Sequence, residues 1–184
     1  MNKTLITLDD YKLYAGISST EREDQILAII KRVSELIKTY CGRKFVDNYD
    51  RYVAEFLPII EYANEPGYYF PKEFPINAVD SVQVSYDKGF TYTKFVDFAL
   101  DRTKDGIYIS GDGYTGINAY KITYRGGYSS VPEDLKLACL DLVDYYYRGE
   151  SVPRKTSGNS VQEYITTSDF PSHIKRVLDL YRVL

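Results

Sequence analysis

The sequence predicts an α+β protein: a small helical bundle with an antiparallel β region inserted between its second and third helices, and an extended C-terminal helix. Two observations lead to this fold class. Apolar residues recur every three or four positions before residue 45 and after residue 129, whereas residues 46–128 alternate in short runs broken by glycine and proline. We therefore expect a helical core formed by residues 1–45 and 129–184, and a β insertion over residues 46–128. A chain of 184 residues is long enough for such a domain.

Two helices are expected before the β region. Thr7 is a good N-cap for a helix over residues 8–15, and Gly16 is suited to end it. Thr20 and Glu23 then have the spacing of a capping box. They predict the start of a second helix, whose apolar stripe runs from Ile26 to Tyr40 before Gly42 ends it.

The β region is predicted from short alternating runs. Strands are expected within residues 51–56, 79–84, 95–100, 107–109 and 120–124, and Asp105-Gly106 is a turn signal. Gly126 and Gly127 follow the last run. Two adjacent glycines here predict a φ above zero, and hence a backbone hinge between the last strand and the third helix.

Two more helices are expected after the β region. Pro132 is suited to a first turn, and the third helix ends near Arg148 and Gly149. Residues 149–162 are rich in Ser, Gly, Pro and Thr, which predicts a mobile loop. The last helix is expected over residues 172–184, and its apolar stripe must be covered, either by helices of the same chain or by a partner.

Composition excludes several classes of protein. Lys and Arg number 23 against 26 Asp and Glu, a net charge of −3, so tight non-specific DNA binding is not expected. No apolar run is long enough to span a membrane, and the N-terminal residues do not read as a signal peptide. Cys41 and Cys139 lie in helical patterns and are expected to be buried free thiols. The 20 Tyr residues fit either extensive interfaces or a β-rich domain that uses Tyr on its strands.

Candidate chemistry in the sequence is weak. Residues 111–116 match G-x-G-x-x-G, but the residues that follow continue as a strand where a dinucleotide site needs a helix, so a hairpin loop is expected. His173 is the one histidine, and no third group is evident that would orient it as a catalytic base. The spacing of His and Cys does not fit zinc. We expect no enzymatic activity, no metal and no cofactor.

The order of several segments is similar to that of a known family. These segments are Leu5–Lys12, Tyr40–Phe45, Phe74–Val82, Ile122–Tyr128, Val131–Lys136, Phe170-Pro171 and Leu180–Arg182. Together they resemble the bacteriophage head–tail connector, or adaptor, family, whose members form a ring beneath the portal. The long β region between the second and third helices departs from the smallest members of that family.

The resemblance implies a structural virion protein, made in the host cytoplasm and located at the head–tail interface. It implies a homo-oligomeric ring of about twelve copies that joins the portal to a stopper or tail protein. Genomic DNA would pass through without sequence-specific binding. The last helix would dock on the portal through Ile174, Lys175, Arg176, Val177, Leu178, Tyr181 and Arg182.

An alternative of another class is a β-rich binding module on a helical scaffold. Tyr68, Tyr69 and Phe70 would then form an aromatic face that could stack on carbohydrate.

Overall fold

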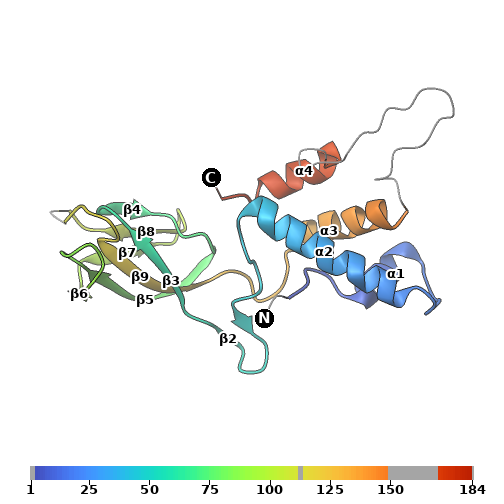
Figure 1. Cartoon of the computed structure of the whole chain (residues 1–184), viewed down its shortest axis with the longest axis horizontal. Helices are drawn as coiled ribbons and strands as arrows, with labels where there is room; N and C mark the ends of the chain where they lie inside the picture. The colour runs from blue at the N-terminus through green and yellow to red at the C-terminus, as the bar shows by residue number, and fades with distance from the viewer. Residues whose placement is uncertain (1–2, 112–113, 149–169, 184) are drawn as a thin grey trace. The chain divides into compact units, whose positions relative to one another are not determined.

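The chain divides into two compact units. A computed structural model describes residues 3–111, 114–148 and 170–183. One unit, here called the helical unit, combines Met1–Arg43 with Val131–Leu184, and the other, the β unit, is Lys44–Ser130. The helical unit holds α1 (Leu8–Ala15), α2 (Glu23–Cys41), α3 (Glu133–Tyr147) and α4 (Ser172–Asp179) (Figure 1). The predicted α+β class is therefore confirmed, with the β region between the second and third helices.

Helix α1 begins as the sequence predicts, but α2 does not. Thr7 Oγ1 accepts a hydrogen bond from the N–H of Asp10, and the Asp10 carboxylate accepts one from the N–H of Thr7. The capping box predicted at Thr20 is wrong, because α2 starts after Arg22 without a side-chain cap. The carboxylate of Glu23 instead pairs with Lys12 Nζ at 2.5 Å.

The core of the helical unit lies where α2 meets α3 and α4. The fully buried residues include Ile26, Ile30, Val33 and Ile37 of α2 and Leu135, Cys139, Leu142 and Val143 of α3. Cys41 and Cys139 are buried free thiols, as predicted, and burial raises the pKa of each to about 12.

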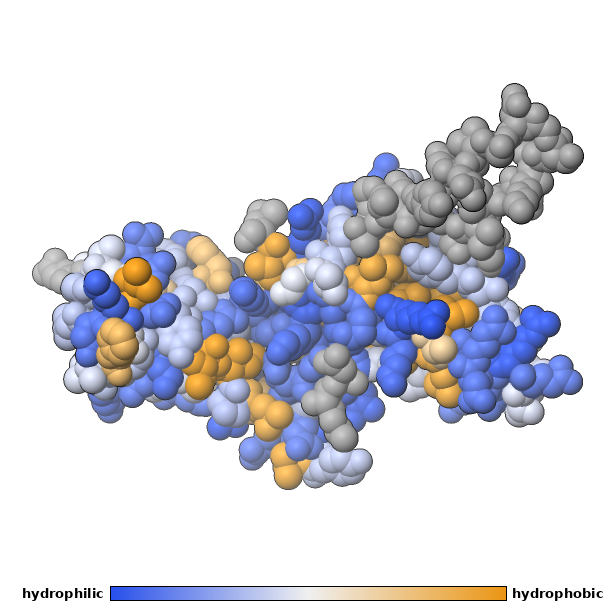
Figure 2. All heavy atoms as spheres, viewed as in Figure 1, coloured by the Kyte–Doolittle hydropathy of each residue, from blue (hydrophilic) through white to orange (hydrophobic). Residues whose placement is uncertain are grey.

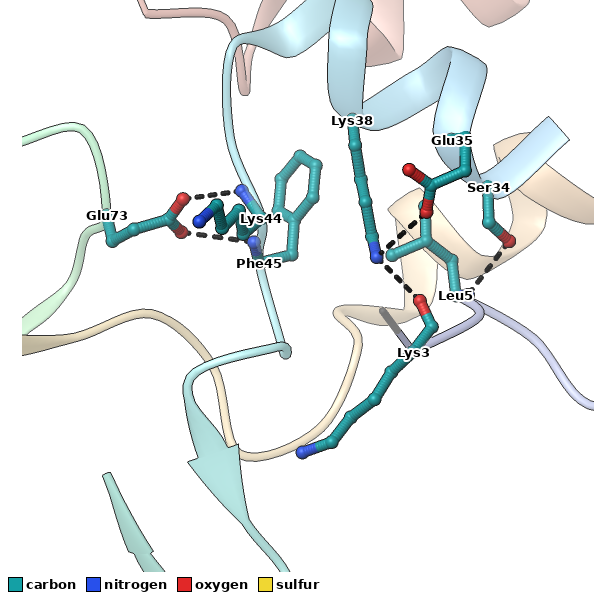
Figure 3. A network of polar contacts seen from close by, with 8 residues as sticks. All are labelled: Lys3, Leu5, Ser34, Glu35, Lys38, Lys44, Phe45 and Glu73. Atoms are coloured by element: carbon teal, nitrogen blue, oxygen red, sulfur yellow. Dashed lines mark hydrogen bonds and ion pairs between the residues drawn. The ribbon is translucent and has the colours of Figure 1, made fainter. Parts of the chain in front are cut away.

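Polar contacts hold the N-terminal segment on α2 (Figure 3). The N–H of Leu5 donates to Ser34 Oγ at 3.0 Å. Lys38 Nζ, nearly buried, donates to the carbonyl of Lys3 at 2.6 Å and lies 3.4 Å from a carboxylate oxygen of Glu35. A buried ammonium is thereby given hydrogen-bond acceptors, as burial requires.

The described residues of the β unit form three antiparallel sheets. Its strands are β1 (Tyr49–Asp50), β2 (Glu55–Phe56), β3 (Ile59–Ala63), β4 (Gly67–Tyr69), β5 (Ile76–Val84), β6 (Thr93–Phe95), β7 (Phe98–Asp101), β8 (Gly106–Ile109) and β9 (Tyr120–Gly126). They pair as a hairpin β1-β2, a four-stranded sheet β3-β9-β5-β6 and a three-stranded sheet β4-β8-β7.

The two larger sheets share one hydrophobic core. It consists of Ile76, Val82, Val84, Ala119, Tyr120, Ile122 and Tyr124 from β5 and β9 and the residue before β9, with Ile107 and Ile109 from β8. Along β9 the burial alternates strictly, as expected of a strand with one face inward. The strand predicted over residues 120–124 is therefore confirmed, and it lies in the core.

Two strand predictions in the β region are wrong in detail. Residues 51–56 do not form one strand, because 51–54 form the turn of the β1–β2 hairpin. The Asp50 carboxylate accepts from the N–H of Tyr52, and Ala54 has a φ of 55°, which together close that turn. Residues 95–100 are not one strand either, since Val96 and Asp97 separate β6 from β7, which belong to different sheets.

The last helix is shorter than predicted. It ends at Asp179 instead of running to residue 184. The N–H of Val183 donates to the carbonyl of Cys41 at 2.9 Å, and Tyr181 Oη donates to Asp134 at 2.6 Å. These contacts hold the C-terminal residues on α2 and α3 in a non-helical path. The loop predicted over residues 149–162 lies outside the described residues.

A buried carboxylate organises the start of the β unit (Figure 3). Glu73, 4% exposed, accepts hydrogen bonds from the N–H groups of Lys44 and Phe45. Phe45 has a φ of 58°, an uncommon value for a residue with a β-carbon. The carboxylate therefore satisfies the backbone donors of a strained segment.

Candidate interaction surfaces

The apolar side of α4 is covered within the chain. Ile174 and Leu178, both predicted to contact the portal, are 1% and 0% exposed and pack in the helical unit. Val177 and Tyr181 are half-buried. In this arrangement Ile174 and Leu178 are not available to a partner, so the part of α4 that can meet one is its outer surface.

The outer surface of α4, together with residues 180–182 that follow it, carries basic side chains and one exposed leucine. Arg176 and Arg182 are exposed, and Leu180 is 74% exposed. Lys175 pairs with Asp179 at 2.7 Å, which raises the pKa of the lysine. The guanidinium of Arg182 lies 5.4 Å from the ring centre of Tyr40. Of the predicted portal-binding residues, Arg176 and Arg182 are the most accessible, and the role of the set remains a prediction.

Gly126 and Gly127 lie where main-chain atoms approach closely. Gly127 has a φ of +100°, and a β-carbon there would lie 2.5 Å from the carbonyl oxygen of Phe45. At Gly126 a β-carbon would lie 2.3 Å from the carbonyl oxygen of Glu73. Both positions thus exclude side chains on steric grounds. Whether they act as a hinge stays a prediction.

Tyrosine hydroxyls bind carboxylates within each unit. The pairs include Tyr11–Asp144 at 3.1 Å, Tyr14–Asp141 at 2.6 Å, Tyr69–Glu61 at 2.5 Å and Tyr124–Glu61 at 2.8 Å. The hydrogen bond to Asp141 is the main reason that the pKa of Tyr14 is raised to about 12. Part of the tyrosine excess therefore serves internal packing in both units.

The predicted aromatic face is only partly open. Tyr68 and Phe70 are 45% and 59% exposed and stack with their ring centres 6.0 Å apart. Lys104 Nζ lies 4.2 Å from the ring centre of Tyr68, however, and the hydroxyl of Tyr69 is bound to Glu61. A sugar ring would have to displace the lysine to stack on Tyr68.

A pocket opens between the two larger sheets of the β unit. It is lined by aromatic side chains of Tyr86, Phe95, Tyr114 and Tyr120, with Asp97 and Ser110 as polar members. Tyr120 Oη is buried and has no hydrogen-bond partner among the described residues. Among the described residues that line it there is one carboxylate, that of Asp97, and no basic side chain with which to bind a phosphate.

Two further surfaces are not anticipated from the sequence. The β1–β2 hairpin stands away from the sheets of the β unit (Figure 1), and its tip residues Tyr52 and Val53 are 101% and 61% exposed. On the helical unit, a mainly apolar groove is lined by Ala28, Ile29 and Leu36 of α2 and Tyr146 of α3, with Gln25 and Arg32 at its polar side. Figure 2 shows apolar residues gathered over the region of α2 and α3. In the sequence, the adjacent apolar residues Tyr52 and Val53 are the signal that could have indicated this tip.

The described residues hold no cluster of metal-ligating side chains. No three His, Cys, Asp or Glu side chains in residues 3–111, 114–148 and 170–183 gather as a metal site would require. His173 is exposed, with Nε2 3.9 Å from Asp141. Residues 114–119 form no helix, so the glycine motif lacks the context of a dinucleotide site, although its residues 112–113 lie outside the described part. No helix among the described residues is both long and apolar enough to cross a bilayer.

Comparison with known proteins identifies the family. Residues 4–184 match the model of the head completion protein family. The chain belongs to this family. The head completion protein of Escherichia phage T5 is 26% identical over 188 residues, which cover 97% of this chain and 98% of that relative. The resemblance seen in the sequence is thus confirmed, and the chain is a phage structural protein of the virion, at the head–tail interface.

Solved structures share the fold at low sequence identity. A chain in the virion of a native gene transfer agent particle aligns with a TM-score of 0.57 at 12% identity, covering 98% of this chain and 90% of the other. A chain in the neck of an empty gene transfer agent particle aligns with a TM-score of 0.55, also at 12% identity and with the same coverage. The combination of a helical unit and a β unit therefore occurs in other particles.

Proposed function

We propose that this chain is a non-enzymatic adaptor that assembles as a ring of about twelve copies. The ring joins the portal to a stopper or tail protein, and genomic DNA passes through it. One observation carries the proposal: the similarity to the T5 head completion protein extends over 97% of this chain and 98% of that relative, so both units are included. Further support comes from the structural similarity to a chain in the neck of a gene transfer agent particle.

The charge of the subunit is compatible with a DNA conduit. The net charge of −3 provides no excess of cations with which to neutralise phosphates. DNA can move through a channel more easily when the channel wall attracts its phosphates only weakly. This supports DNA passage without sequence-specific binding.

Docking on the portal is proposed for the outer surface of α4. Arg176 and Arg182 favour an acidic partner surface, and the exposed side chain of Leu180 adds apolar area. The buried side chains of Ile174 and Leu178 pack α4 against the rest of the helical unit, and so hold this outer surface in place. Deletion of the whole segment would therefore remove core residues, and substitutions of the outer residues give the sharper test.

The ring is tested by measuring the mass of the assembled protein, alone and bound to portal-bearing heads, with electron microscopy of the heads. We expect a closed ring beneath the portal. A protein that stays monomeric under both conditions and does not bind heads would contradict the proposed function.

The α4 contact is tested with the triple variant Arg176→Glu, Leu180→Ser and Arg182→Glu. The matched control is Lys94→Glu, Phe90→Ser and Arg102→Glu, which makes the same kinds of change at exposed positions of the β unit. We expect both variants to fold, and only the first to lose attachment to heads. Equal attachment of the two would show that α4 does not bind the portal.

A further inference from the structure

We propose that neighbouring copies join by insertion of the β1–β2 hairpin tip of one copy into the α2–α3 groove of the next. This inference rests on the proposed ring and assigns its subunit contact. The tip is Tyr52 and Val53, and the groove is the surface lined by Ala28, Ile29, Leu36 and Tyr146.

The hairpin is held in place by contacts at its base. Arg125 of β9 donates from its guanidinium to the carbonyl of Phe56 at 3.0 Å, and its Nε lies 3.1 and 3.2 Å from the two carboxylate oxygens of Asp80. The rings of Tyr49 and Phe56 pack with centres 4.9 Å apart across the hairpin. A two-stranded hairpin is marginal by itself, so these contacts give it a defined conformation before it meets a partner.

The tip presents apolar surface that its own chain does not cover. Tyr52 is 101% exposed and Val53 61% exposed, at the end of a turn fixed by Asp50. A rigid aromatic ring at a protruding position buries a large area on binding and loses little conformational freedom. These are the properties of an anchor residue that enters a pocket.

The groove on the helical unit has complementary chemistry. Its walls are apolar, and Arg32 supplies the one charged side chain among its lining residues. The turn carries two carboxylates, Asp50 and Glu55, and one cation, Arg51, so it has one more negative than positive side chain. The side chain of Glu55 is 69% exposed, with a carboxylate oxygen 3.9 Å from the Arg125 guanidinium at the hairpin base. Insertion would bring the exposed carboxylate of Glu55 near Arg32, in addition to burying the apolar tip.

The occupant is assigned as a second copy because a closed ring needs two different patches on each subunit. In such a heterologous interface, one patch of a copy meets the other patch of its neighbour. This chain provides a protruding apolar tip on the β unit and an apolar groove on the helical unit, with opposite charges beside them. A single patch that met itself would close a dimer and leave no free surface for a third copy.

Disulfide trapping tests this contact. Val53→Cys and Ala28→Cys are placed together in the full-length chain, whose own Cys41 and Cys139 are buried. Mild oxidation of assembled rings, and of heads that carry them, should give covalent species larger than a dimer, because each copy links to two neighbours. The matched control is Val53→Cys with Thr39→Cys, which lies exposed on the same helix but does not line the groove. Each single variant is a second control.

A charge reversal on the groove gives an independent measure. Arg32→Glu should weaken ring assembly by about fivefold, the scale of an exposed ion pair, whereas Lys31→Glu, at an exposed position of α2 that does not line the groove, should leave assembly unchanged. If rings form but the variant with Val53→Cys and Ala28→Cys gives no more covalent product than the control, the hairpin contact is wrong and the ring proposal stands. A covalent product that stops at a dimer would likewise overturn the contact. Failure of the unaltered protein to form rings would overturn both proposals.

Discussion

Leu178 of α4 lies against Cys41, the last residue of α2. The thiol of Cys41 donates to the carbonyl oxygen of Leu178 at 3.5 Å, and both side chains are fully buried. The nearby Val183 N–H donates to the carbonyl of Cys41. Helix α4 is thus part of the core of the helical unit, although residues 148–171 separate it from α3 in the chain.

Leu178→Ala is expected to destabilise the helical unit by about 2–5 kcal/mol, because it removes a fully buried side chain and leaves a cavity. Leu180→Ala, two residues later and 74% exposed, should change the free energy of unfolding by less than about 0.5 kcal/mol. Chemical denaturation of both variants measures the difference. Equal stability of the two would mean that α4 does not pack as described.

Gly127→Ala should lower stability by about 2–3 kcal/mol, since alanine is strained at a φ of +100° and its β-carbon would meet the carbonyl of Phe45. Gly126→Ala should have an effect of similar size through the carbonyl of Glu73. Gly111→Ala is the control, because no atom lies within 4 Å of a β-carbon built there. Thermal unfolding of the three variants tests this. Equal melting temperatures for all three would contradict the steric explanation.

Local signals in the sequence predict the elements whose ends depend on neighbouring residues. The hydroxyl of Thr7 caps α1, Gly42 ends α2 in the left-handed conformation, and Pro132 precedes α3. The alternation along residues 120–124 predicts the central strand β9. In each case the physical cause lies within a few residues of the element.

The errors arise where distant residues decide the structure. The hairpin base depends on Arg125, 69 positions away from the Phe56 carbonyl that it holds, and the end of α4 depends on Cys41 and Asp134. The interaction surfaces follow the same rule. The groove forms because Tyr146 of α3 lies beside α2. The apolar periodicity of α2 or of α3 shows which face of that helix is buried, but not which residues of the neighbouring helix that face contacts.

Tyr120→Phe is expected to leave stability unchanged or to raise it slightly, because the buried Tyr120 hydroxyl has no partner among the described residues. Tyr124→Phe, on the same inward face of β9, should instead cost about 1–3 kcal/mol. Its hydroxyl donates to Glu61 at 2.8 Å and accepts from the N–H of Glu73 at 3.3 Å. Denaturation of the pair measures the contrast, and a larger loss for Tyr120→Phe would show that its hydroxyl has a role in the folded protein.

Acid should weaken the helical unit through Asp10. Burial tends to raise the pKa of this carboxyl, but hydrogen bonds from Lys136 and from the backbone and hydroxyl of Thr7 outweigh burial and lower the pKa from 3.8 to about 2. A group with a lowered pKa in the folded state stabilises the fold above its unfolded value and loses that contribution as the pH falls toward its folded value. The contribution of Asp10 is therefore present above about pH 4 and is lost between about pH 4 and pH 2.

Asp10→Asn removes this titration, so the variant should be less stable than the unaltered protein at neutral pH, and the difference should shrink as the pH falls from about 4 to about 2. Asp9→Asn changes a neighbouring exposed carboxyl of the same helical turn that takes no part in the capping box, and serves as the control. Melting temperatures measured across this pH range test the linkage. A difference between Asp10→Asn and the unaltered protein that stays constant from neutral pH to about pH 2 would show that the pair of Asp10 with Lys136 does not contribute to stability in the ionised form.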